Sequence, residues 1–106
     1  MKINVVHIID SLNSGGAETV AVNTVNALNS GKKVNAYLCV TREEGALKTH
    51  VQDLSRYIFL NKKSTIDLKA IKKLKKFIIA NKISILHAHS TSFFLAYLIK
   101  LHLKKI

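Results

Sequence analysis

The chain has 106 residues, one cysteine and a formal net charge of +11. This length allows one domain at most, and a single cysteine excludes an intrachain disulfide framework, so a reducing compartment is expected. No export signal is recognisable, and the apolar stretch at residues 93–99 is far shorter than the roughly 20 residues of a membrane-spanning helix. We therefore expect a cytoplasmic protein.

The first half of the chain alternates strand and helix patterns. Residues 3–9 form a nearly continuous apolar run, typical of a buried parallel strand. A helix is predicted from Ala17 to the stop at Gly31, and a second strand at residues 34–41 has apolar side chains on both faces. The expected buried face of this helix consists of Ala17, Val20, Ala21, Thr24, Val25 and Leu28.

The same alternation continues in the second half. A short helix is predicted at residues 46–54 and a third strand at 57–60. Asp67 begins a longer helix, and a fourth strand covers residues 83–89. Ser90 to Ser92 then offer caps for a last helix. The apolar side of the longer helix is expected to consist of Leu68, Ile71, Leu74, Phe77 and Ile78.

This rhythm predicts an α/β fold with a Rossmann-like parallel sheet in the order 3-2-1-4. The last helix is apolar nearly all round, and the chain ends where a fifth strand is expected. We therefore interpret residues 1–106 as an incomplete domain. Its uncovered fourth strand and last helix predict self-association.

The sequence Gly15-Gly16-Ala17-Glu18 lies between the first strand and its helix. Glycines at such a turn let backbone N–H groups approach a ligand, and a helix N-terminus favours anions, so a phosphate could bind here. The spacing excludes the dinucleotide fingerprint, and no P-loop lysine follows. Alternatively, the two glycines only make a tight turn.

Ligands of open parallel sheets bind at the carboxyl ends of the strands, where the strand order reverses. The residues expected to line this crevice are Asp10, Ser11, Gly15, Gly16, His89, Ser90 and Thr91. Asp10 could cap the loop or bind a hydroxyl-rich substrate. Glu18 could contact a ligand or favour the helix N-terminus, and the second role is preferred.

Two histidines, His87 and His89, alternate on the fourth strand and point to one face. A metal site needs a third ligand, and no matching cluster of Asp, Glu or Cys is evident, so no metal is expected. His7 is interpreted as structural and His89 as the better ligand contact. No catalytic triad can be identified, and no catalytic residue is assigned.

The positive charge is concentrated after Asp67, where no acidic residue occurs. This asymmetry indicates an anionic partner, or simply a lysine-rich composition. Nucleic acid is disfavoured because aromatic residues are not interleaved with the lysines. The lysines concerned are Lys69, Lys72, Lys73, Lys75, Lys76, Lys82, Lys100, Lys104 and Lys105.

The glycine motif together with His87-Ala88-His89-Ser90 resembles the N-terminal domain of family 4 glycosyltransferases, which have the GT-B fold. The resemblance implies retaining transfer from a nucleotide-sugar to a glycan or lipid-linked acceptor, with no cofactor and no required metal. It places Gly15 and Gly16 against the donor diphosphate.

Asp10, Glu18, His89 and Ser90 are the residues expected to face the acceptor or the transferred sugar. The resemblance also implies a C-terminal donor-binding domain absent from this sequence, a role in bacterial surface polysaccharide synthesis, and peripheral attachment to the inner membrane face. Without that domain the fragment is expected to be inactive. The competing hypothesis is a standalone basic α/β module that binds an anionic membrane or a polyanion.

Overall fold

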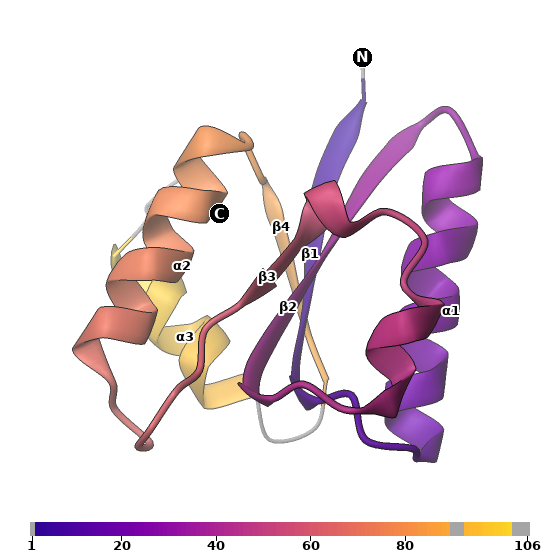
Figure 1. Cartoon of the computed structure of the whole chain (residues 1–106). Helices are drawn as coiled ribbons and strands as arrows, with labels where there is room; N and C mark the ends of the chain where they lie inside the picture. Colours follow the sequence, from indigo (N-terminus) through magenta and orange to yellow (C-terminus); the bar gives the residue numbers. More distant parts are fainter. Residues whose placement is uncertain (1, 90–92, 103–106) are drawn as a thin grey trace.

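The structure, a computed structural model, describes residues 2–89 and 93–102 (Figure 1). Its described strands form one sheet in the order β3-β2-β1-β4, and all neighbouring pairs are parallel. This confirms the predicted α/β fold and strand order. The strands are β1 (Ile3–Ser11), β2 (Val34–Glu43), β3 (Tyr57–Phe59) and β4 (Ile85–Ala88).

Helices cover both faces of the sheet. Figure 1 shows α1 (Gly16–Ser30) on one side and α2 (Leu68–Ala80) with α3 (Phe93–His102) on the other. Helical cover on both faces explains why the central strands are apolar without interruption. None of these described helices has the length and apolar character needed to span a membrane.

Two hydrophobic clusters lie on opposite faces of the sheet, as the alternation of β2 predicts. The α1 side contains Val5, Ile9, Ala21, Val22, Val25, Ala36, Leu38 and Val40. The side of α2 and α3 contains Val6, Ile8, Tyr37, Cys39, Ile71, Leu74, Ile78, Leu95 and Ile99. Alternate apolar residues of β1 and β2 therefore belong to opposite clusters.

The buried face of α1 differs from the predicted one. Val20 is 59% exposed and Ala17 is also exposed, whereas Val22 is buried. Ala21 and Val25 are buried as expected. The stripe is therefore rotated around the helix, towards Val22 and away from Val20.

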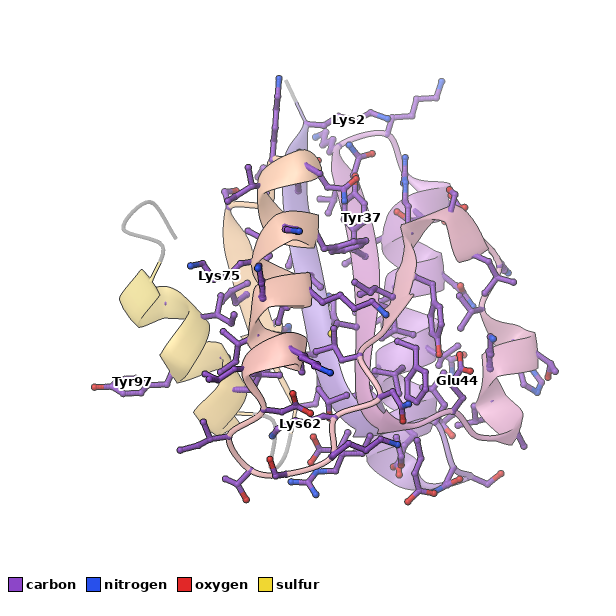
Figure 2. The ribbon with its side chains drawn as sticks, turned by 60° about the vertical axis from the view of Figure 1, so that its left-hand side comes forward. Lys2, Tyr37, Glu44, Lys62, Lys75 and Tyr97 are labelled. Carbon is purple, nitrogen blue, oxygen red and sulfur yellow. The ribbon has the colours of Figure 1, made fainter. Side chains whose placement is uncertain are left out.

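Helix α2 has the expected amphipathic form, with one exception. The side chain of Asp67 caps its N-terminus and accepts hydrogen bonds from the backbone N–H groups of Lys69 and Ala70. Leu74 is fully buried, but Leu68 is 75% exposed and contributes nothing to the core. Figure 2 shows the side chains of this helix around Lys75.

The predicted helix at residues 46–54 is not formed. Two 3₁₀ turns, η1 (Ala46–His50) and η2 (Leu54–Arg56), take its place. Gly45, just before η1, packs tightly on the connection between β1 and α1, because a β-carbon there would lie 2.5 Å from the carbonyl of Leu12. The N–H of Leu47 also donates to the oxygen of Leu12 at 3.0 Å.

The edge strand β4 has β1 as its one sheet neighbour within the described ranges. A groove of about 570 Å³ runs along it, between β4 and α3. Tyr97, on α3 beside this groove, is 51% exposed and extends away from the sheet (Figure 2). The caps expected at residues 90–92 lie outside the described residues.

Candidate functional site

The loop that contains Gly15 and leads into Gly16, here called the glycine loop, connects the carboxyl end of β1 with α1. Gly15 is the N-cap of α1 and has extended backbone angles, and no side chain accepts a hydrogen bond from the first turn at this position. A β-carbon added to Gly16 would have nothing within 4 Å. The start of α1 is therefore sterically open at Gly16, as a backbone anion site requires.

Glu18 folds back over the start of its own helix. Its Oε1 would lie 2.8 Å from a β-carbon on Gly15, so the carboxylate packs directly against this glycine. The hydroxyl of Ser11 donates to Glu18 Oε2 at 3.4 Å. The carboxylate thus brings negative charge to the positive end of the helix.

Asp10 is held on the other face of the sheet. The hydroxyl of Thr41 donates to Asp10 Oδ1 at 2.6 Å, and Thr41 alternates with Tyr37 and Cys39 on the α2 side. Lys62 is buried and interacts electrostatically with Asp10. Burial lowers the pKa of its ammonium group. The Asp10 carboxylate therefore lies among polar side chains on the α2 side of the sheet.

His89 directly follows β4. Its backbone N–H donates to the oxygen of Ile8 at 2.9 Å, which extends the pairing of β4 with β1 by one residue. Its ring lies on the same face of the sheet as α1. Ser90, the next predicted site residue, lies outside the described residues.

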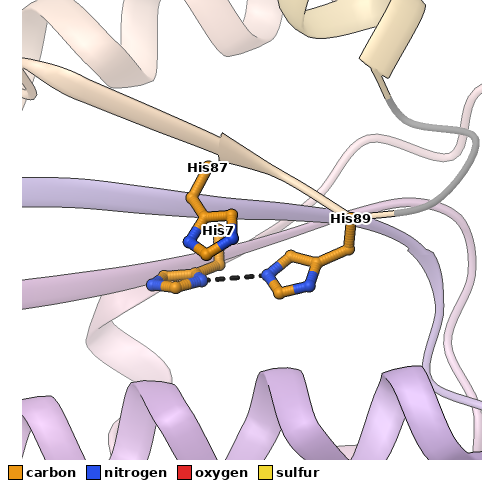
Figure 3. A group of neighbouring side chains, drawn as sticks. All are labelled: His7, His87 and His89. Atoms are coloured by element: carbon orange, nitrogen blue, oxygen red, sulfur yellow. Dashed lines mark hydrogen bonds between the residues drawn. The ribbon is translucent and has the colours of Figure 1, made fainter.

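Three histidines meet on this face, and we call them the histidine cluster: His7 from β1, and His87 with His89 from the β4 segment (Figure 3). His7 and His87 are register partners in the parallel pair. His7 Nδ1 lies 3.0 Å from His89 Nε2, within hydrogen-bond distance. The sequence pattern predicts that His87 and His89 share a face, and it predicts a structural role for His7, which the structure places in contact with both.

The rings of the cluster are close and differ in exposure. His87 and His89 stack with centroids 4.5 Å apart and planes 12° apart, and the His7 centroid lies 4.6 Å from that of His87. His7 is 2% exposed, while His87 is exposed to solvent. The cluster therefore extends from the sheet interior to its β4 edge.

Burial lowers the pKa of two members of this cluster, His7 and His89. It lowers the pKa of His7 to about 4, with a further contribution from the neighbouring imidazoles of His87 and His89. Burial, together with the charge of His87, also lowers the pKa of His89. His7 is consequently neutral at pH 7, the form in which imidazole accepts hydrogen bonds or ligates a metal.

The predicted site residues therefore fall into separate groups in space. Gly15, Gly16 and Glu18 form one group around the start of α1, and His89 joins the histidine cluster on the same face. Asp10 lies with Thr41 on the opposite face. Their roles towards donor and acceptor stay predictions.

A family model described as Glycosyltransferase Family 4 matches residues 14–106 of the chain. The matched region contains the glycine loop, Glu18 and the whole β4 segment, and begins after Asp10. Comparisons with curated proteins and with solved structures found no match.

Proposed function

Because the chain belongs to glycosyltransferase family 4, we propose that it forms the acceptor-side part of a retaining glycosyltransferase. The enzyme transfers a sugar from a nucleotide-sugar to a glycan or lipid-linked acceptor in bacterial surface polysaccharide synthesis. The nucleotide-sugar is a substrate, and no cofactor is required.

The open start of α1 is the observation that carries this proposal. It lies at the carboxyl end of β1, the strand whose neighbours β2 and β4 lie on opposite sides. In open parallel sheets this reversal of strand order is where ligands bind. The backbone N–H groups at Gly15 and Gly16 face the donor diphosphate, and His89 faces the acceptor or the transferred sugar.

Glu18 determines how an anion enters this loop. Its carboxylate packs against Gly15 and carries the same charge as a phosphate. A diphosphate must therefore displace this side chain or bind beside it. Removing the charge with Glu18→Gln strengthens anion binding, because the repulsion between two negative groups disappears.

The test is a titration of the ¹⁵N-labelled chain with inorganic pyrophosphate, followed by NMR. We expect saturable shifts of the Gly15 and Gly16 amide signals. Gly16→Ala weakens these shifts, because its new methyl group occupies the open space at the loop, whereas Gly31→Ala at the other end of α1 leaves them unchanged. Shifts confined to the α2 lysines, or none at the loop, contradict the proposal.

Sugar transfer is measured separately, with the complete reading frame that contains this chain. Nucleotide-sugars labelled in the sugar are incubated with the protein and with lipid-linked glycan acceptors. We expect incorporation of label with retention at the anomeric carbon. An inverted product, or no incorporation from any of the common nucleotide-sugars, contradicts the assignment.

A second candidate function is binding to an anionic membrane surface through α2. Leu68 and Ile79 are 75% and 64% exposed on this helix, next to the exposed lysines Lys72 and Lys76. Exposed apolar side chains beside lysines are typical of helices that lie on membrane surfaces. This surface could hold the enzyme close to a lipid-linked acceptor.

Vesicle flotation tests this second function. Each lysine near an anionic surface contributes about 1 kcal/mol, so the double variant Lys72→Gln and Lys76→Gln binds anionic vesicles about 30-fold more weakly. The matched control replaces Lys32 and Lys33, which are exposed in the turn between α1 and β2. Equal loss in both double variants, or no binding by the parent chain, excludes a specific α2 surface.

A further inference from the structure

The histidine cluster offers three nitrogen ligands from two adjacent strands. In a parallel pair, register partners project side chains to the same face, and so does the residue two positions along. His7 opposite His87, with His89 two residues further, therefore places three rings side by side. One ring nitrogen from each lies within 4.8 Å of the other two.

One of these nitrogen–nitrogen distances is close to that between the ligands of a bound metal ion. Tetrahedral zinc with bonds of about 2.0–2.1 Å holds its ligand nitrogens about 3.3 Å apart. The His7 Nδ1 and His89 Nε2 atoms are 3.0 Å apart in a hydrogen bond, and its proton moves to the other nitrogen of its own ring when both atoms bind the ion. The His87 ring stacks on His89 with planes 12° apart, so it must turn for its nitrogen to point to the same centre, and its exposure to solvent leaves room for this turn.

The chemistry of the donors selects the class of ion. Imidazole ligands favour zinc, copper, nickel or cobalt, whereas magnesium and calcium prefer oxygen ligands. Three protein ligands also leave a fourth position for water. The exposed His87 gives an ion access from solvent, and the buried His7 anchors the inner end of the site.

We propose that His7, His87 and His89 form a binding site for a divalent transition-metal ion of the zinc class. The site goes beyond the proposed function, because sugar transfer by this family requires no metal. A bound ion ties the carboxyl end of β4 to β1. It also holds the His89 ring in one orientation beside the acceptor side of the crevice.

Cobalt titration of the chain, purified without a histidine tag, tests the proposal. Co²⁺ serves as the probe because four-coordinate Co²⁺ has intense visible absorption, and calorimetry gives the affinity in the same sample. We expect one ion per chain, an absorption spectrum of a four-coordinate site, and displacement of the cobalt by Zn²⁺. A higher melting temperature with saturating Zn²⁺ is also expected, because the ion binds only the folded chain.

Variants locate the ligands. His87→Gln weakens cobalt binding by more than about tenfold, and it leaves the fold intact because this side chain is exposed. His50→Gln removes an exposed histidine outside the cluster and leaves the affinity unchanged. His7→Asn and His89→Gln, checked for folding by circular dichroism, weaken binding as His87→Gln does.

Three results overturn the metal site: no cobalt binding at millimolar concentration, unchanged affinity in His87→Gln, or an equal loss in His50→Gln. The pyrophosphate titration distinguishes this proposal from the sugar-transfer function. His87→Gln does not alter the shifts at Gly15 and Gly16, so either proposal can fail while the other holds.

Discussion

Gly45→Ala is expected to destabilise the chain strongly, although the substitution adds one methyl group. The new β-carbon would lie 2.5 Å from the backbone atoms of Leu12 and Asn13, which cannot move aside as a side chain could. Gly45 has a negative φ of −119°, so the effect comes from the close contact and not from backbone strain. The displaced backbone belongs to the connection that leads to the glycine loop.

The magnitude follows from two terms. Overpacking of a tight site costs about 1–3 kcal/mol. Displacing the Leu12 carbonyl also weakens its hydrogen bond from Leu47, which is a loss of about 1 kcal/mol. A total of about 3 kcal/mol lowers the melting temperature of a chain of this size by about 12–24 °C.

Thermal unfolding followed by circular dichroism measures this effect. Gly16→Ala is the matched control, because its β-carbon enters open space at the first helical position, and its free energy of unfolding should stay within about 0.5 kcal/mol of the parent. The reasoning is refuted if Gly45→Ala melts within about 3 °C of the parent chain, or if both variants lose the same stability.

Three further outcomes are expected. Leu74→Ala, at a fully buried position of α2, costs about 2–5 kcal/mol in urea unfolding, whereas Leu68→Ala on the exposed side changes stability by less than about 0.5 kcal/mol; equal effects would contradict the buried face assigned to α2. Burial raises the pKa of the Cys39 thiol, so a thiol reagent at pH 8 should modify it only after unfolding, and rapid reaction of the native chain would show that Cys39 is accessible. The groove along the edge strand β4 predicts concentration-dependent self-association in sedimentation velocity, which a stable monomer at all concentrations would exclude.

The sequence predicts the faces of the strands better than it predicts where the buried face of a helix ends. Alternation in β2 assigns each residue to a face without ambiguity, because the side-chain period of a strand is two. In α1, Ala21 and Val25 lie at the centre of the stripe, but Val20 and Val22 are both apolar and lie on its two flanks. Composition does not distinguish these flanks, and packing against the sheet selects Val22.

The segment after Gly45 shows how tertiary contacts override local spacing. Leu47, Val51 and Leu54 recur at helical intervals, but the Asn26 side chain donates to the oxygen of His50 and accepts from the N–H of Gln52. These bonds use backbone groups that a continuous helix would pair internally. The segment therefore breaks into two 3₁₀ turns, and of its apolar side chains Val51 is buried, Leu47 packs partly buried against the core, and Leu54 is 55% exposed.

The histidine cluster depends on strand register, which the sequence alone does not provide. The sequence places His7 on the first strand and His87 with His89 on the fourth, but a pairing shifted by one residue would put His7 opposite Leu86, on the face away from His87. The actual pairing places His7 opposite His87, one residue further along. A shift of one residue moves a side chain to the other face of the sheet, so the third nitrogen ligand could not be recognised.

The pairing of β1 with β2 is irregular near the carboxyl end of β1. Ile9 pairs with Val40, but Ser11 pairs with Glu43, so β2 has one extra residue between these points. Such bulges bend a strand and redirect side chains, and they are frequent beside functional sites. Here Asp10 bonds to Thr41 on the α2 side, while Ser11 bonds to Glu18 on the α1 side. The anion proposed to bind at the start of α1 would therefore lie beside the Glu18 carboxylate, whereas the Asp10 carboxylate lies on the opposite face of the sheet.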